Sequence, residues 1–460
     1  MSHRFNPTSL REYDIRGVVG ETLGEADAEA VGRSFGTVVR RAGGRRVAVG
    51  RDGRDSSPAF EARLVAGLAA SGCDVVRIGL GPTAMLYYAE AELGVDGGVQ
   101  ITGSHNPADY NGFKMVLGHQ AFFGERIQAL GRMSAEGDWE EGAGTVADEA
   151  VMDRYVDRLL EGFEGGPFRV GWDAGSGAGG PVVDRLVERL PGEHFTLYTE
   201  VDGRFPHHHP DPTVEANLED LKRLVREKKL DFGIALDGDA DRVGAVDGEG
   251  RVIWGDQLLS ILAEPVLEAL PGATIIADVK ASQALFDRIA ELGGKPLMWK
   301  TGHSLIKSKM KETGAPLAGE MSGHVFFAHR WYGFDDGIYA GLRLIEAVSR
   351  LGGSLTALRD AMPAMVNTPE IRFQVDESRK FAVVDEILGR LEAEGARVDR
   401  TDGARVTTGD GWWLLRASNT QDVLVARAEA KDEAALERLM AEIDAQLVRS
   451  GIERGPQAGH

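Results

Sequence analysis

The sequence Gly98-Val-Gln-Ile101, continued by Thr102-Gly-Ser-His-Asn-Pro107, is typical of a strand that ends in a polar loop. The first four residues are short and partly β-branched, and Asn-Pro followed by Tyr110-Asn-Gly112 indicates an immediate turn. Ser104 is therefore expected at a strand tip, where α/β proteins hold ligands. There its Oγ could act as a nucleophile or carry a phosphate. The alternative is an ordinary Ser/Thr turn beside a surface histidine.

The pattern around this loop occurs three times in the chain. In each copy an apolar run ends in Asp and leads into a turn and a helix, and a second polar loop follows a later apolar run. The first runs are Val47–Asp52, Arg169–Asp173 and Thr274–Asp278, and the second loops are Gly98–Pro107, Gly233–Arg242 and Pro316–His324. This order predicts three related α/β domains with mixed sheets, each offering one loop to a shared central cleft.

The pattern changes after about Pro363, where strands and helices predict a smaller C-terminal α+β domain. The expected elements are strands over Ile371–Val375, Trp412–Arg416 and Val423–Ala430, and helices over Phe381–Glu394 and Glu433–Arg449. An acidic, Gly-rich linker, Ser134–Gly144, precedes an expected helix, Asp148–Leu160. The predicted domains are 1–147 with the Ser104 loop, 148–252 with an Asp-rich loop, 253–364 with a Glu320 loop and 365–460 with an Arg416 loop.

Composition narrows the class of protein. The chain has 460 residues, 43% of them hydrophobic, which is enough apolar material for several packed cores. Its formal net charge of −20 disfavours nucleic acid and anionic membrane surfaces as partners. No apolar run is long enough to span a bilayer, and Cys73 is the single cysteine, so no internal disulfide can form. We therefore expect a soluble, cytoplasmic protein.

The segment Asp237-Gly-Asp-Ala-Asp241 places three carboxylates at alternate positions. In a loop they can converge on one hard cation, and they would repel each other strongly without one. Mg²⁺ suits this spacing because it keeps open positions for phosphate oxygens. Calcium is the rival cation, although the EF-hand ligand pattern is missing, and the remaining alternative is an Asp-rich surface turn.

Three other stretches also suggest ligand chemistry. Gly175–Gly180 fits G-x-G-x-x-G between a predicted strand and helix, with Glu200 about twenty residues on, as in dinucleotide-binding folds. Arg416–Thr420 combines a guanidinium, hydroxyls and an amide, a set that suits a phosphate dianion or else a polar hairpin loop. His207–His209 looks like a zinc run, but adjacent residues between prolines rarely converge on one ion.

Five ordered motifs, spread over essentially the whole chain, resemble the α-D-phosphohexomutase family and within it the bacterial phosphomannomutase/phosphoglucomutase branch. They are Glu12–Gly17, Thr102–Pro107, Asp237–Arg242, Gly319–His324 and Arg416–Thr420. That family has four domains around a central cleft, with the first three built alike. The resemblance implies an isomerase that interconverts hexose 1-phosphate and hexose 6-phosphate, of mannose, glucose or both. The route it implies uses an active-site phosphoserine and a 1,6-bisphosphate that reorients in the cleft.

The resemblance also implies site residues and ligands. Ser104 is expected to be the phosphoserine, and one Mg²⁺ per chain is expected on Asp237, Asp239, Asp241 and an oxygen of phosphorylated Ser104. The expected catalytic residues are Ser104, His105, Lys114, Arg242, His303 and His324, and the expected substrate-binding residues are Tyr13, Arg16, Lys280, Glu320, Ser322, Arg416, Ser418, Asn419 and Thr420. Hexose phosphates are the expected substrates, hexose 1,6-bisphosphate the intermediate and activator, and the chain is expected to be a monomer or homodimer.

Three readings compete with this one. Phosphoglucosamine mutase is the nearest, and its members commonly have Gln where this chain has Met321. A dinucleotide-dependent oxidoreductase would use Gly175–Gly180, and a non-catalytic sugar-phosphate binding protein would use the same cleft without transfer. The chain also departs from its relatives at Gln421-Asp422, where Thr or Glu and then Pro are common. Asp422 adds a negative charge beside an expected phosphate site.

Overall fold

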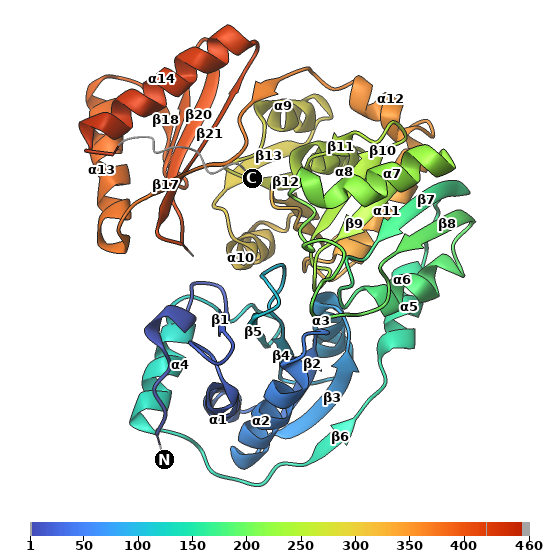
Figure 1. The fold of residues 1–460 in the computed structure, drawn as a ribbon, viewed down its shortest axis with the longest axis vertical. Coiled ribbons are helices and arrows are strands. Elements are labelled where there is room, and N and C mark those ends of the chain that lie inside the picture. The colour runs from blue at the N-terminus through green and yellow to red at the C-terminus, as the bar shows by residue number, and fades with distance from the viewer. Residues whose placement is uncertain (1, 420, 453–460) are drawn as a thin grey trace.

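Four β-sheets follow one another along the chain in a computed structural model that describes residues 2–419 and 421–452 (Figure 1). Their strand orders are β1-β5-β4-β2-β3-β6, then β11-β10-β9-β7-β8, then β13-β12-β14-β15, then β16-β21-β20-β19-β18 with β17 also paired to β21. Three mixed α/β sheets are thus followed by an antiparallel C-terminal sheet, as the sequence predicts. The exact domain limits stay predictions.

The strands of the first two sheets are β1 (Ile15–Val18), β2 (Arg46–Arg51), β3 (Asp74–Leu80), β4 (Gly97–Ile101), β5 (Tyr110–Leu117), β6 (Val146–Asp148), β7 (Phe168–Asp173), β8 (Gly192–Leu197), β9 (Phe232–Leu236), β10 (Val243–Asp247) and β11 (Val252–Ile253). Those of the last two are β12 (Thr274–Asp278), β13 (Lys295–Trp299), β14 (Leu317–Gly319), β15 (Val325–Phe327), β16 (Val366–Asn367), β17 (Ile371–Gln374), β18 (Arg397–Asp399), β19 (Ala404–Thr407), β20 (Gly411–Ala417) and β21 (Val423–Ala430).

The helices are α1 (Glu25–Arg41), α2 (Ser57–Ala70), α3 (Thr83–Glu92), α4 (Glu125–Glu136), α5 (Met152–Leu160), α6 (Gly180–Val187), α7 (Glu219–Lys228), α8 (Gly255–Ala269), α9 (Gln283–Glu291), α10 (His303–Thr313), α11 (Gly337–Arg350), α12 (Leu355–Asp360), α13 (Glu377–Ala393) and α14 (Glu433–Arg449). Two short 3₁₀ turns cover Pro7–Ser9 and Glu215–Leu218. No helix in the described part of the chain is both long and apolar enough to cross a membrane.

The first three sheets repeat one topology. The strand orders β3-β2-β4-β5, β8-β7-β9-β10 and β13-β12-β14-β15 are equivalent, and in each the first three strands are parallel and the fourth is antiparallel. The polar loops predicted from the sequence are the connections β4–β5, β9–β10 and β14–β15, which occupy the same place in each copy. The predicted repeat is therefore confirmed.

Hydrophobic packing joins the second and third copies to part of the first. One buried cluster contains α3 of the first copy together with the strands and helices of the next two, including Trp172 and Tyr339. The remainder of the first copy packs around Phe35 and Phe60, and the C-terminal unit has its own core around Trp413. In Figure 1 that C-terminal unit, in orange and red, lies at one side of the other three. The shared core fixes the first three loops relative to one another, since close-packed interiors resist deformation.

Short edge strands account for most differences from the sequence prediction. Ile15–Val18 is a strand paired with β5 that was not anticipated. The helix expected from Asp148 begins at Met152, because Val146–Asp148 forms a parallel edge strand beside β3. The first three residues of the expected linker, 134–136, belong to the end of α4, and β18 and β19 were not anticipated. Such strands of two to four residues carry too little periodicity to be recognised.

Candidate active site

Ser104 lies in the β4–β5 loop in a left-handed backbone conformation, with φ of 52° and 2% of its surface exposed. A non-glycine residue pays a steric cost there and stays only when its surroundings hold it. The backbone N–H of Ser104 donates to Thr102 Oγ1 at 2.8 Å. Its Oγ lies 3.1 Å from His105 Nδ1 and donates to Asp237 Oδ2 at 3.4 Å. The loop therefore holds the hydroxyl against the acidic loop of the second domain.

The three carboxylates of the β9–β10 loop are fully buried and lie together, within 4.8 Å of one another through one oxygen each. Burial, reinforced by Asp241 and Asp239, raises the pKa of Asp237 well above its ordinary value. Asp239 Oδ1 and Asp241 Oδ1 have no hydrogen-bond partner. Buried carboxylate oxygens without a partner are costly, and a hard divalent cation is the group that such oxygens suit. The donor set therefore fits a cation.

Lys114 of β5 supplies a positive charge to this cluster. Its Nζ donates to Asp239 Oδ2 at 2.7 Å and also to Asp241 Oδ2. Burial opposes the charge, but the carboxylates of Asp239 and Asp241 outweigh it, so the pKa of Lys114 lies well above its ordinary value. Thr83, at the start of α3, adds a hydroxyl donor to Asp239 Oδ2 at 2.5 Å. The first domain thus contributes a hydroxyl, an ammonium and a helix start to the acidic loop of the second.

Histidines of the third domain face this cluster. His324, beside β15, lies 3.5 Å from Asp241 Oδ1, and its Nε2 accepts a hydrogen bond from Arg242 Nε at 2.9 Å. Burial lowers the pKa of His324 to about 4, with Arg242 adding to the effect, so its imidazole is neutral near pH 7. The ring of His303, at the start of α10, lies 5.4 Å from that of His324. Burial lowers the pKa of His303 well below its ordinary value.

Glu320, in the β14–β15 loop, is 4% exposed. Its Oε1 accepts the backbone N–H of Gly302 at 2.6 Å, and its Oε2 lies 3.5 Å from Ser322 Oγ and 3.4 Å from His324 Nδ1. Burial, with Asp278 next, raises the pKa of Glu320 to about 7. A carboxyl group with these properties can accept hydrogen bonds from hydroxyl groups of a ligand.

The C-terminal domain reaches the first and third domains through the loop after β20. Asn419 Nδ2 donates to Tyr13 OH at 3.0 Å, and Tyr13 OH donates to the Thr301 carbonyl at 3.0 Å. Arg416 is 6% exposed and its Nε donates to Asp402 Oδ2 at 2.9 Å. The loops of all four units are thereby brought together.

The remaining predicted residues lie as follows. Lys280 follows β12 and pairs with Glu370 at 3.1 Å, while Arg16 on β1 pairs with Asp14. Ser418 Oγ accepts the backbone N–H of Gln421 at 3.2 Å. Thr420 falls outside the described residues. Gln421, the first residue of the departure from the relatives, accepts from Arg372 Nη1 at 3.2 Å through its side chain and from Lys380 Nζ at 3.1 Å through its carbonyl.

The Gly175–Gly180 loop packs against the acidic loop instead of forming an open cradle. Ala178 N–H donates to the Gly238 carbonyl at 2.9 Å, and a Cβ on Gly177 would lie 2.6 Å from the same oxygen. A dinucleotide pyrophosphate needs that helix start to be free. The dinucleotide reading therefore loses its structural basis.

Several buried residues at the site were not anticipated. Asp335 lies 3.6 Å from His303 and 3.7 Å from His324 and pairs with Lys307 at 2.8 Å. Asp241, His324 and Asp335 form a second group of possible metal ligands in the described part of the chain. Asp335 follows a turn rather than an apolar run, so its only sequence signal is the pair Asp335-Asp336.

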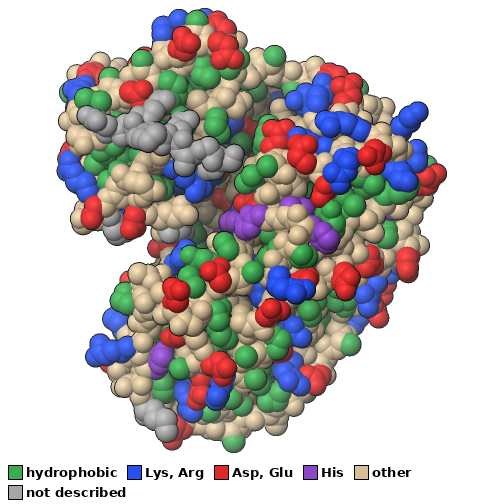
Figure 2. All heavy atoms as spheres, in the orientation of Figure 1, with side chains coloured by type: hydrophobic (Ala, Val, Ile, Leu, Met, Phe, Trp, Pro, Cys, Tyr) green, Lys and Arg blue, Asp and Glu red, His purple; other side chains and the backbone are tan. Residues whose placement is uncertain are grey.

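The molecular surface is hollowed between the C-terminal unit and the N-terminal part below it (Figure 2). Acidic and basic side chains are mixed over the visible face, so the net charge of −20 is not gathered there into one acidic patch. Two described cavities, of about 280 and 550 Å³, have no residue in common with the predicted site residues.

Comparisons with known proteins cover nearly the whole length of the chain. Family models named phosphoglucomutase/phosphomannomutase match as alpha/beta/alpha domain I at residues 7–136, domain II at 153–250, domain III at 254–365 and the C-terminal domain at 370–446. The chain is 46% identical to a phosphomannomutase/phosphoglucomutase of Pseudomonas putida, with 96% of each chain covered. It is 43% identical to a phosphoglucomutase of Neisseria gonorrhoeae, with 94% of each covered.

Among solved structures, a phosphoglucomutase/phosphomannomutase family protein from Burkholderia thailandensis matches with a TM-score of 0.92 and 44% identity. The match covers 97% of this chain and 98% of that one.

Proposed function

We propose, given that this chain belongs to the phosphoglucomutase/phosphomannomutase family and is a hexose-phosphate mutase, that Ser104 carries the transferred phosphoryl group. The observation that carries the proposal is the contact of Ser104 Oγ with Asp237 beside Lys114. Phosphorylated Ser104 gives its phosphoryl group to a hexose monophosphate, and the resulting 1,6-bisphosphate turns round in the cleft. Ser104 then takes the other phosphoryl group, so that the phosphate moves between O1 and O6 of the sugar.

Asp237, Asp239 and Asp241 would hold one Mg²⁺, together with an oxygen of the phosphorylated Ser104. Two of their buried oxygens without a partner and the raised pKa of Asp237 support this assignment. When bound, the cation neutralises charge that develops on the phosphoryl oxygens during transfer. Lys114 holds Asp239 and Asp241 in place through its two hydrogen bonds, and it keeps a permanent positive charge beside them.

Proton transfer falls to His303, whose lowered pKa leaves a neutral imidazole able to accept a proton from an attacking hydroxyl. His324 is also neutral but serves to position its neighbours. Arg242 donates to His324 Nε2, which leaves Nδ1 as the nitrogen that carries the proton in the neutral ring. His105 lies within hydrogen-bonding distance of Ser104 Oγ and orients that hydroxyl.

Substrate recognition is divided between the third and fourth domains. Glu320 and Ser322 read sugar hydroxyls, because Glu320 is a buried acceptor at the tip of a loop. The clamp for the non-reacting phosphate comprises Arg416, Ser418, Asn419 and Thr420, and Tyr13, Arg16 and Lys280 line the cleft between the clamp and Ser104. An arginine with hydroxyl and amide donors binds a phosphate dianion through charge-assisted hydrogen bonds.

Further ligand and assembly assignments stay predictions. Hexose 1,6-bisphosphate is proposed both as intermediate and as the donor that rephosphorylates Ser104 after it loses its phosphate. A monomer or homodimer in the cytoplasm is also proposed. Met321 favours a hexose substrate over an amino sugar, since phosphoglucosamine mutases commonly carry Gln at that position.

A coupled assay of hexose 6-phosphate formation tests the proposal. Ser104→Ala should lower kcat by at least about 10³-fold, the scale seen when a catalytic nucleophile is removed. Ser176→Ala is the matched control, because Ser176 is likewise buried and left-handed, with φ of 57°, but lies in the loop between β7 and α6. EDTA should abolish turnover and Mg²⁺ should restore it. Normal turnover by Ser104→Ala, or by metal-free protein, would contradict the proposal.

A further inference from the structure

Arg54 is a completely buried arginine in the turn after β2, with 1% of its surface exposed, and no role follows for it from the proposed chemistry. Asp52, the last residue of the apolar run, accepts Arg54 N–H at 3.0 Å and Arg54 Nε at 3.1 Å. A buried ion pair alone is a weak stabilising feature, because desolvation offsets the attraction. Burying a guanidinium this deeply therefore calls for further partners.

Those partners are backbone carbonyls of the Ser104 loop. Nη2 of Arg54 donates to the Ser104 carbonyl at 2.9 Å and to the Asn106 carbonyl at 2.6 Å. Nη1 donates to the Tyr110 carbonyl at 2.9 Å and to the Pro107 carbonyl. Both terminal nitrogens of the Arg54 guanidinium thus donate to carbonyls of a single loop. A lysine has no planar fork and cannot reproduce this set.

The Arg54 guanidinium is closely packed between the Ser104 loop and the second domain. A Cβ on Gly103 would lie less than 3 Å from the Arg54 guanidinium, so glycine is what lets the loop lie on it. Gly103 N–H donates to Asp52 Oδ2 at 3.1 Å. Phe205 of the second domain covers the guanidinium, with Arg54 Cζ 5.1 Å from the ring centroid. The Asp52–Arg54 pair therefore joins the Ser104 loop to the start of α2 and to the second domain.

The repeat shows that this position is used differently in each copy. Asp173 and Asp278 end β7 and β12, Asp52 directly follows the equivalent strand β2, and all three are buried. The basic partner is Arg54 in the first copy, His208 at 3.0 Å in the second and Lys280 at 3.8 Å in the third. Arg54 and Lys280 hold the same place in their copies, two residues after the Asp. In the first copy, the Arg54 guanidinium also donates to carbonyls of the Ser104 loop in the same domain.

From these contacts we infer that Arg54 is a positioning residue for phosphoryl transfer: it fixes the Ser104 loop in the left-handed conformation that presents Oγ to Asp237. The inference rests on the proposed role of Ser104. By drawing four carbonyl oxygens toward itself, Arg54 turns their negative ends away from the place of an incoming phosphate. It also supplies the surroundings that keep Ser104 at φ of 52°. Without the Arg54 guanidinium, the backbone of Ser104 relaxes, and its Oγ is no longer aligned with the phosphoryl group that is transferred.

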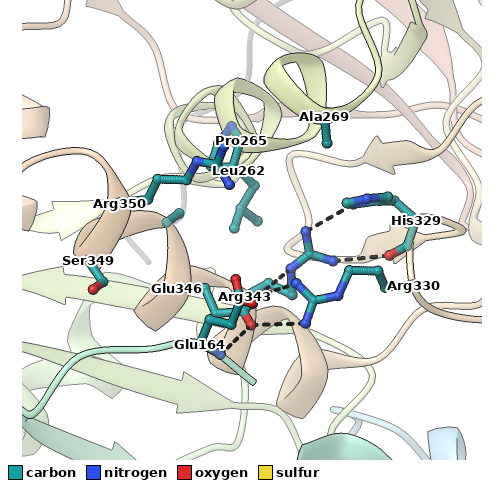
Figure 3. Close-up of a pocket in the computed structure, with 11 residues that line it drawn as sticks. Glu164, Leu262, Pro265, Ala269, His329, Arg330, Arg343, Glu346, Ser349 and Arg350 are labelled. Carbon is teal, nitrogen blue, oxygen red and sulfur yellow. Dashed lines mark hydrogen bonds and ion pairs between the residues drawn. The ribbon is translucent and has the colours of Figure 1, made fainter. Parts of the chain in front are cut away.

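The test compares Arg54→Lys with a matched variant, Arg343→Lys. Arg343 is 6% exposed, donates to the His329 carbonyl at 3.0 Å and to Tyr339 OH at 3.1 Å, and pairs with Glu346 at 2.9 Å. Figure 3 shows its guanidinium between His329 and Glu346, in a cavity that has no residue in common with the proposed site. Both changes remove a buried fork, but only one concerns the Ser104 loop.

Three readouts are measured on each full-length variant: the unfolding temperature, kcat and KM with a hexose 1-phosphate, and the rate at which hexose 1,6-bisphosphate phosphorylates Ser104, by intact mass. Arg54→Lys should lower kcat and the phosphorylation rate together, by about 100-fold, the effect of a misplacement near 1 Å. Its KM should stay within about threefold, since the phosphate clamp is in another domain. Arg343→Lys should leave kcat and the phosphorylation rate within about twofold.

Equal phosphorylation rates in the two variants would overturn the inference and leave Arg54 as a core residue. If Arg54→Lys does not fold, Gly103→Ala pushes on the same contact while keeping the arginine, and it should slow Ser104 phosphorylation at unchanged KM. A normal rate in Gly103→Ala would also overturn the inference. The wild-type protein separates this outcome from failure of the proposed function: absence of phosphate on wild-type Ser104 refutes the phosphoserine, whatever the variants do.

Discussion

The Ser104 hydroxyl donates to Asp237 Oδ2 at 3.4 Å, although 133 positions separate the two residues in sequence. The contact joins equivalent loops of the first and second copies of one repeated fold. Gly238, the next residue, lies against the Ser104 carbonyl. The Ser104 loop and the acidic loop are therefore aligned because their backbones touch, and a change in that spacing should act directly on the proposed phosphoryl transfer.

Gly238→Ala should lower kcat by about 100-fold, on the scale of a small misplacement of reacting groups. The added Cβ would lie less than 3 Å from the Ser104 carbonyl oxygen, so the two loops must separate. Gly389→Ala is the control, because a Cβ there meets nothing within 4 Å and the residue lies in α13. That variant should keep normal kcat and gain about 0.5–1 kcal/mol in stability. Steady-state kinetics that do not distinguish the two variants would refute the argument from loop alignment.

Asp402→Ala should raise KM for hexose phosphates by about tenfold, or roughly 1.4 kcal/mol, with a smaller change in kcat. Asp402 Oδ2 accepts both Arg416 Nε at 2.9 Å and Thr301 N–H at 3.0 Å, so it orients the proposed phosphate clamp against the third domain. Asp410→Ala, which breaks the exposed pair with Arg438 in the same domain, should leave KM unchanged. Substrate titrations in which both variants show the wild-type KM would remove Asp402 from the clamp.

Asp336 should make the protein less stable as the pH rises from about 5 to 8. Burial raises the pKa of Asp336 to about 7, although it accepts from Tyr155 OH at 2.8 Å and from Tyr339 N–H at 2.9 Å. The unfolded chain loses this proton near pH 4 and the folded chain near pH 7, so the native state holds the extra proton between these values. Stability therefore falls as the pH rises towards 7 and levels off above it.

The unfolding temperature of Asp336→Asn should therefore fall less between pH 5 and pH 8 than that of the wild type. Asp376→Asn is the matched control, since Asp376 also caps a helix but its pKa is lowered by Ser378. Its contribution varies only below about pH 5, so this control should follow the wild-type slope in the window. Identical slopes for all three proteins would show that Asp336 does not hold the extra proton.

Glucose 1-phosphate and mannose 1-phosphate should both be substrates, within about tenfold in kcat/KM. The bisphosphate must bind in two orientations, and O3 and O4 exchange places between them, so Glu320 can accept from both. The two sugars differ only at C2. A contact to the C2 hydroxyl cannot be made equally well in both orientations, so recognition should not depend on it. Galactose 1-phosphate, inverted at C4, should be much poorer because Glu320 loses a buried partner. Rapid turnover of the galactose compound, measured beside the other two, would remove Glu320 as the reader of the ring.

The repeated fold was predictable from sequence because each copy carries the same strong signals. An apolar run ends in Asp52, Asp173 or Asp278, and each is followed by a turn and a helix that the structure contains. The proposed ligand-binding residues could also be identified from the sequence, since they cluster in polar loops after strands. Short edge strands such as β18 were not, because three residues show no clear period.

The supporting contacts could not be predicted for a different reason. Arg54 donates to four backbone carbonyls, and Asp402 accepts a backbone N–H of another domain. Every residue type offers such backbone groups, so the sequence does not mark these partners. Asp335 reaches His303 and His324 only through the fold of the third domain. Roles of this kind depend on distances between distant segments, which periodicity and motif spacing do not contain.

The most direct test of the central claim is to locate the phosphate. Wild-type protein, Ser104→Ala and Ser176→Ala are incubated with labelled hexose 1,6-bisphosphate and Mg²⁺, and intact-mass and peptide mass spectrometry follow. The account predicts one phosphate on Ser104 in the wild type and in Ser176→Ala, lost on addition of hexose monophosphate at the rate of turnover, and none in Ser104→Ala. Phosphate on another residue, or turnover with no phosphate on Ser104 at any time, would contradict it.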